Sequence, residues 1–112
     1  MLERSVVWLG DSLEAMRAFP DDARRIGFQL WLVQCGREPS DWKPMPTVSL
    51  GVREIRIHTG AEHRVFYIAT FGEAVYVLHA FEKRTPRTPK GALDLAKSRL
   101  RELVVRRARR TG

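Results

Sequence analysis

The 112-residue sequence has a single cysteine, few acidic residues in its second half and no long hydrophobic run. Because Cys35 has no second cysteine to pair with inside the chain, the sequence favours a reducing, cytoplasmic setting. The apolar run at residues 6–9 is too short for a secretory signal, and no stretch reaches the length of a membrane span. We therefore expect one cytoplasmic domain over residues 1–112 that does not involve a membrane.

Common catalytic and metal-binding motifs are also missing. The sequence has no glycine-rich phosphate loop, no Gly-x-Ser-x-Gly motif, no cysteine pair and no His-Glu-x-x-His helix. His58, His63 and His79 lack metal-ligand spacing, so we expect neither a metal site nor a cofactor. His79 lies in an apolar segment, which favours an interior histidine with satisfied hydrogen bonds over a proton shuttle.

Charge is distributed unevenly along the chain. Residues 1–56 contain eight acidic and eight basic residues, whereas residues 57–112 contain five acidic and twelve basic residues. The whole formal net charge of +7 therefore lies in the second half. Such an asymmetry favours a polyanionic partner, either a nucleic acid or an acidic protein.

The first part of the chain predicts a strand followed by two helices. Residues 5–9 form a brief apolar run typical of a strand, and Asp11 with Glu14 resembles a capping box at the start of a short helix. A second helix is expected from Pro20 to the residue before Gly36, its C-cap. The two helices are expected to form a hairpin.

The second helix carries apolar side chains on more than one side. A buried stripe is expected at helical spacing, and it consists of Ala23, Ile26, Leu30 and Val33. Phe28 and Trp31 are predicted to widen this buried surface. Gly27 is expected to permit close packing against a sheet.

A proline-rich segment at residues 37–51 follows these helices. It has no apolar period and is expected to be an irregular surface loop. Trp42 is predicted to pin this loop onto the body of the protein. The alternative is a stacking contact to RNA from Trp42, with Lys43 as a phosphate ligand.

Three consecutive strands are predicted downstream of this loop. Their segments are rich in β-branched and aromatic residues and are separated by turn residues. They span residues 52–58, 63–71 and 74–83 and describe an antiparallel meander. Because side chains alternate along a strand, Arg56, Arg64 and Lys83 are expected to lie within reach of one another.

A basic connector at residues 84–89 leads to a final helix. Thr88 as N-cap and Pro89 as first helical residue predict where this helix begins. An apolar stripe gives the helix a buried side, and basic residues such as Lys97 surround it. Residues 106–112 are expected to fray because they lack apolar partners.

Cationic side chains on a sheet can cleave RNA without a metal ion. RNA carries its own nucleophile, the 2′-hydroxyl group, so a protein needs only to align it, to stabilise charge on the phosphate oxygens and to assist two proton transfers. Arginine binds phosphate oxygens through its planar fork, and a lysine near other cations can transfer protons. These roles fit Arg56, Arg64, Lys83 and Arg84, although a solvated strand face would carry the same residues.

Several short motifs extend this interpretation through their order and spacing. They are Trp-Leu-Gly-Asp at residues 8–11, Trp-Lys-Pro-Met at 42–45, Glu-Ile-Arg-Ile at 54–57, His-Arg-Val-Phe-Tyr at 63–67, and the segment 77–89, which ends in Lys-Arg-Thr-Pro-Arg-Thr-Pro. With these motifs the chain resembles the RelE/ParE superfamily of toxins from bacterial toxin-antitoxin pairs, in particular its HigB-type, phage-associated branch. The resemblance covers nearly the whole chain.

The resemblance implies an α+β domain in which an N-terminal helical hairpin packs on a small, mainly antiparallel sheet, with a C-terminal helix. It implies a ribosome-associated endoribonuclease that cleaves translated mRNA without a metal ion and thereby inhibits translation and growth. It also implies an antitoxin, usually a helix-turn-helix protein, as a partner besides the ribosome and mRNA.

Residue roles are carried over from the family by motif. The implied catalytic residues are Arg56, Arg64 and Lys83. Arg84 stands where the family pattern has a second lysine, and it keeps the charge but does not titrate. We also predict RNA contacts from the basic side chains of the loop, the connector and the final helix, namely Lys43, Arg84, Arg87, Lys90 and Lys97.

Two other functions fit the same sequence. A ParE-like protein would inhibit DNA gyrase without cleaving RNA, and fold alone does not separate it from a nuclease. A non-catalytic, nucleic-acid-binding accessory protein would bind in a salt-dependent manner without forming a product. The cationic residues of the predicted strands favour the nuclease.

Overall fold

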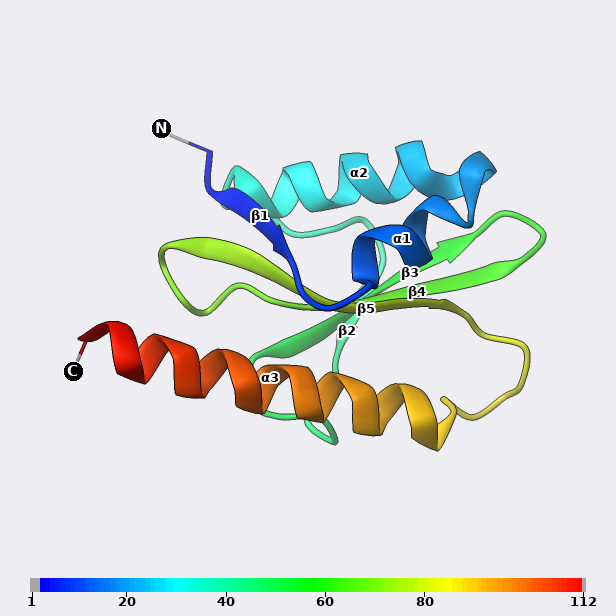
Figure 1. Ribbon diagram of the computed structural model, residues 1–112. Coiled ribbons are helices and arrows are strands. Elements are labelled where there is room, and N and C mark those ends of the chain that lie inside the picture. The colour runs from blue at the N-terminus through cyan, green and yellow to red at the C-terminus, as the bar shows by residue number, and fades with distance from the viewer. Residues whose placement is uncertain (1–2, 112) are drawn as a thin grey trace.

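The computed structural model describes residues 3–111, which form an α+β fold with helices on both faces of one sheet (Figure 1). The elements are β1 (Ser5–Trp8), α1 (Ser12–Arg17), α2 (Pro20–Gln34), β2 (Trp42–Pro44), β3 (Val52–His58), β4 (Glu62–Ile68), β5 (Ala74–Glu82) and α3 (Lys90–Thr111). None of the helices in residues 3–111 combines the length and apolar character that a membrane span requires.

The sheet contains five strands in the order β1-β5-β4-β3-β2. The predicted meander is confirmed, because β3, β4 and β5 pair with their neighbours in antiparallel fashion. β2 adds a further antiparallel edge strand, whereas β1 pairs with β5 in parallel and makes the sheet mixed. The expectation of a mainly antiparallel sheet therefore holds, with one parallel pair.

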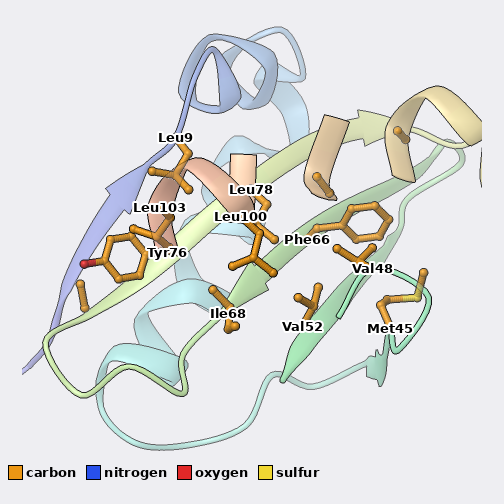
Figure 2. Packing of buried hydrophobic residues seen from close by; sticks show 13 residues of the cluster. Leu9, Met45, Val48, Val52, Phe66, Ile68, Tyr76, Leu78, Leu100 and Leu103 are labelled. Atoms are coloured by element: carbon orange, nitrogen blue, oxygen red, sulfur yellow. The ribbon is translucent and has the colours of Figure 1, made fainter. Parts of the chain in front are cut away.

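Each face of the sheet carries its own hydrophobic cluster, because strand side chains point alternately to opposite faces. On one face, Phe66, Tyr76 and Leu78 pack against Leu100 and Leu103 of α3, as Figure 2 shows. The other face packs against α2, and its fully buried members include Ile26, Leu30, Val65, Tyr67 and Val77. The two N-terminal helices and α3 thus cover opposite faces (Figure 1).

The long helices begin and end close to the predicted residues. α2 starts at Pro20, and its last turn closes on Gly36, whose φ of +80° is easily adopted by glycine. The amide of Arg37 donates to the carbonyl of Leu32, which is the bond of a Schellman motif. α3 starts at Lys90, one residue after the predicted start at Pro89.

The predicted capping box is wrong. Asp11 precedes α1, but its side chain makes no capping hydrogen bond. Instead its carboxylate accepts a hydrogen bond of 2.5 Å from Arg99 Nη2 of α3, and Arg99 Nη1 donates to the Leu78 carbonyl. An ion pair across the molecule has replaced a local cap.

The predicted burial of the second helix is wrong on one side. Phe28 and Trp31 are 52% and 40% exposed, so they face solvent instead of the core. A side chain at Gly27 would meet no atom within 4 Å, so close packing does not explain this glycine. The buried stripe that includes Ile26 and Leu30 already fills the contact with the sheet.

Two other segments are more ordered than predicted. The irregular loop contains β2, in which Trp42 pairs with Ile55 and lies half buried under the guanidinium of Arg53, 4.0 Å from the ring centroid. The expected fraying of residues 106–112 is wrong as far as Thr111, because α3 continues to that residue. Residue 112 lies outside the described part of the chain.

An ion pair explains the order of the α3 C-terminus. Arg107 Nε donates to Glu73 at 2.6 Å, and the guanidinium also lies over the ring of Phe71. The hydrogen bond from Arg107 lowers the pKa of Glu73 to about 2. Arg107 of the basic tail therefore has partners, which the apolar pattern alone could not reveal.

Candidate functional site

The strand register brings the three implied catalytic residues to one end of the sheet. Arg56 of β3 lies directly opposite Arg64 of β4. The backbone amide of Lys83 donates to the Glu62 carbonyl at 2.7 Å, so Lys83 continues β5 beside the start of β4. Figure 1 shows that the β3–β4 hairpin tip and the connector from β5 to α3 lie at this same end.

A carboxylate that has no exposed surface lies within this group of cations. Glu54 of β3 pairs with Lys43 of β2 on one side and with Phe66 of β4 on the other. Its Oε1 atom lies 3.6 Å from Arg64 Nε and 3.9 Å from Lys43 Nζ. Neither carboxylate oxygen has a hydrogen-bond partner among residues 3–111, so charge attraction from two sides is its main compensation for burial.

The guanidinium of Arg64 is already engaged by the protein. The Arg64 side chain is only 3% exposed. Nη2 donates to Glu62 Oε1 at 2.9 Å and Nη1 donates to the backbone carbonyl of His63 at 3.2 Å. Nη1 and Nη2 are therefore committed to the protein, whereas the buried Nε atom has no hydrogen-bond partner among residues 3–111.

His58 joins Glu62 to the loop before β2. Its Nδ1 atom lies 2.7 Å from Glu62 Oε1, and its Nε2 atom lies 2.7 Å from Asp41 Oδ2. Both ring nitrogens can donate only in the protonated imidazolium. These bonds to Glu62 and Asp41 raise the pKa of His58, and the bonds from His58 and Arg64 lower the pKa of Glu62.

Two of the three implied catalytic residues have no carboxylate partner. Arg56 and Lys83 are half buried and form no ion pair within residues 3–111. The Nε atom of Arg56 is buried and makes no hydrogen bond to the described residues. These two cations therefore are the ones available to a bound anion.

The predicted RNA-binding residues are spread over a wider surface. Arg84 is 79% exposed and pairs with Glu82, while Arg87 and Lys90 are exposed on the connector and at the start of α3. Lys43 is drawn toward the buried Glu54. Lys97 is not part of this group, because it lines a groove with Val48 and Arg101 along α3.

His79 differs from the expected interior histidine. It is half buried and stacks on Phe81 with ring centroids 5.3 Å apart, but its buried Nδ1 atom has no hydrogen-bond partner among residues 3–111. Burial, with the positive charge of Arg99 nearby, lowers the pKa of His79. Both effects disfavour the protonated ring.

The acidic partners of the cations were not predicted from the sequence. Alternation places Glu54 on the same strand face as Arg56, and that was the available signal. Glu62 carried the same signal, because it lies two residues before Arg64 on β4, whereas Asp41 carried none, because its contact depends on how a loop folds. No group of three or more possible metal-binding side chains is found within residues 3–111.

We predict that Glu54→Gln destabilises the protein, because it removes the negative charge beside the buried Arg64. The expected loss in free energy of unfolding is about 3 kcal/mol, measured by urea denaturation. Glu38→Gln is the matched control, since the Glu38 side chain is 65% exposed in its 3.8 Å pair with Arg53 and should cost less than about 1 kcal/mol. Equal losses in the two variants would contradict this role for Glu54.

We also predict a pH dependence of stability from His58. Its folded pKa is raised above the ordinary value of 6.5, so its contribution is complete below that pH and is lost as pH rises through the folded pKa. Wild type should therefore lose stability relative to His58→Gln as the pH rises from 6.5 through the folded pKa. The comparison requires urea denaturation of both proteins at each pH, and a constant difference would refute the prediction.

Comparison with known families accounts for most of the chain. Residues 14–101 match the protein family described as Phage derived protein Gp49-like (DUF891). No curated protein matches the chain. The chain therefore belongs to the Gp49-like family of phage-derived proteins, which is associated with RelE and toxin-like proteins of toxin-antitoxin systems.

Proposed function

We propose that this protein is a HigB-type toxin with a RelE-like fold, and that it cleaves translated mRNA on the ribosome without a metal ion. The observation that carries the proposal is the meeting of Arg56, Arg64 and Lys83 at one end of the sheet, with two of the three charges left without a carboxylate partner within residues 3–111. Membership in a toxin-associated family supports it.

The proposed reaction is attack by the 2′-hydroxyl of RNA on the adjacent phosphorus. The new bond joins O2′ to phosphorus, and the bond from phosphorus to the 5′ oxygen of the next nucleotide breaks. One proton leaves the 2′-hydroxyl and another reaches the departing 5′ oxygen. The products are a 2′,3′-cyclic phosphate, or a 3′-phosphate after hydrolysis, and a 5′-hydroxyl.

Arg56 and Lys83 take the direct roles in this proposal. The fork of Arg56 binds the non-bridging oxygens of the scissile phosphate, on which negative charge grows as the 2′-hydroxyl attacks. Lys83 stabilises the same charge or protonates the departing oxygen. Arg56 belongs to β3, and Lys83 directly follows β5 and is hydrogen bonded to β4. Strands hold cations in place better than a free loop does.

Arg64 is buried and takes an indirect role in this proposal. It lies beneath the surface, where its charge adds to the positive potential of the site. It contacts phosphate when the phosphate displaces Glu62 from Nη2. Glu62 then remains bound to His58, so its charge keeps one partner.

The surrounding basic residues guide RNA and ribosome to the site. Arg84, Arg87 and Lys90 lie on the connector and at the start of α3, next to Lys83 in the chain. Lys43 flanks the site on β2, and Lys97 contributes a further contact to ribosomal RNA along α3. A helix-turn-helix antitoxin encoded with the toxin is the proposed neutralising partner.

The test is to produce the protein without an antitoxin in a bacterial host and to map new mRNA 5′ ends. Arg56→Gln and Lys83→Gln should each reduce cleavage within translated regions by about 100-fold or more and relieve growth arrest. Arg17→Gln is the control, because Arg17 is an exposed residue of α1 without an ion pair among residues 3–111.

The outcomes separate the proposed function from its alternatives. Growth arrest with intact mRNA would contradict the nuclease and favour gyrase inhibition. Cleavage that persists in both Arg56→Gln and Lys83→Gln would move the active site elsewhere. Thermal unfolding of each purified variant shows whether a loss of cleavage is only a loss of folded protein.

A further inference from the structure

An aromatic pair lies exposed on the outer side of α2. Phe28 and Trp31 are 52% and 40% exposed, and their rings stack with centroids 5.9 Å apart and an angle of 30° between the planes. Apolar surface is best removed from water, so a stacked and exposed aromatic pair is a candidate ligand contact. Their position is not explained by the core, which the other side of α2 completes.

Phe28 also lines a groove of about 460 Å³ between α2 and the edge of the sheet. The groove walls include Arg24 and Arg25 of α2 together with Arg56 and Ile57 of β3. Arg24, Arg25 and Phe28 face the same groove because residues three and four apart lie on one side of a helix. An aromatic ring and three guanidinium-bearing residues thus surround one open space.

The groove exists because β2 is short. β2 pairs with residues 53–55 of β3, and the last backbone hydrogen bond beyond them is donated by the Arg56 amide to the Asp41 carbonyl at 2.9 Å. At Ile57 the described chain places no further strand on the outer side of β3. The edge of the sheet is therefore open beneath α2.

Nearby carboxylates are largely neutralised by other partners. Asp22 is buried, accepts hydrogen bonds from Thr59, contacts His63 and lies 3.8 Å from Arg25. Arg24 forms no ion pair within residues 3–111. The groove consequently keeps a positive charge beside its aromatic wall.

We propose that this groove binds one nucleotide of single-stranded RNA next to the scissile phosphate, with its base stacked on Phe28 and its phosphate held by Arg24 and Arg25. This combination of an aromatic face with basic side chains is what single-stranded RNA requires. The inference rests on the proposed function, because Arg56 belongs both to this groove and to the cation group of the candidate site.

RNA fits this groove better than an acidic peptide does. A base needs one flat ring to stack on, which Phe28 offers, whereas an anchored peptide needs an enclosed apolar pocket. The groove is open, and arginine is the commonest side chain on its walls. Its continuity with Arg56 also gives an RNA strand a path around the edge of β3 to the phosphate site.

The test uses the full chain and a fluorescein-labelled, 2′-O-methyl RNA hexamer, whose dissociation constant is measured by fluorescence anisotropy. This probe lacks the attacking hydroxyl, so binding is measured whether or not the protein is a nuclease. Phe28→Ala should weaken binding roughly 5- to 100-fold, and Phe28→Tyr should restore it, since stacking needs only an aromatic face. Leu50→Ala, at an 87% exposed position in the loop between β2 and β3, should bind like wild type.

The contribution of charge is tested separately with Arg24→Gln. Each phosphate contact to a single strand adds about 0.7 to the slope of log affinity against log salt concentration, so this variant should lose about that much. Arg17→Gln serves as the matched control, and its slope should not change.

Two results would overturn the proposal. One is unchanged hexamer binding in Phe28→Ala that retains the wild-type thermal unfolding midpoint. The other is weakened hexamer binding in Phe28→Ala that Phe28→Tyr does not restore, which would exclude stacking on an aromatic face. In the first case, loss of binding to an acidic, leucine-containing peptide in Phe28→Ala would assign the groove to a protein. If wild type fails to cleave mRNA but Phe28→Ala still weakens hexamer binding, the nucleotide site stands and only the nuclease is lost.

Discussion

Glu54 places a negative charge in the interior of the sheet, and the cation group is arranged around it. A carboxylate without solvent and without hydrogen bonds must be compensated by nearby positive charge. Lys43 of β2 and Arg64 of β4 supply this charge from the two strands that flank β3. The interaction therefore holds the edge strand β2 and the buried Arg64 beside Glu54. Arg56, two residues further along β3, remains available to a bound anion.

The basic character of the chain serves structure as well as binding. Arg99 and Arg107 of α3 pair with Asp11 and Glu73, so ion pairs fasten the helix to the sheet along its length. Other cations form no ion pair within residues 3–111, and two of them, Arg56 and Lys83, lie at one end of the sheet. That end carries the β3–β4 hairpin tip and the connector (Figure 1). A count of charges along the sequence cannot separate these two uses, because pairing depends on the fold.

Strong local patterns made much of the fold predictable. β3 was predicted at its exact bounds because alternating β-branched residues lie between turn residues, and α2 was predicted from Pro20 and Gly36 at its ends. β2 was missed, since three residues that include Pro44 have little strand character alone and are held by pairing with β3. Phe28 was predicted to lie in the core because it is hydrophobic. The sequence does not show how much of the surface of α2 contacts the sheet.

The position of the candidate site could be predicted from the sequence, but the partners of its cations could not. Strand alternation placed the three cations together, and the register agrees with that placement. Alternation places Glu62 on the same strand face as Arg64, two residues away, but it could not reveal that their side chains are hydrogen bonded, because that contact depends on rotamers. The groove lined by Phe28 could not be predicted either, since it forms where β2 ends and leaves the edge of β3 open.

The central claim, cleavage of RNA by its own 2′-hydroxyl, is tested most directly by the chemistry of the cut ends. Purified protein is added to ribosomes translating one defined mRNA, and the downstream fragment is treated with polynucleotide kinase and labelled ATP, with and without prior phosphatase. The account predicts that the fragment is labelled without phosphatase, because its 5′ end is a hydroxyl. A fragment that is labelled only after phosphatase carries a 5′-phosphate, and that result would contradict the account.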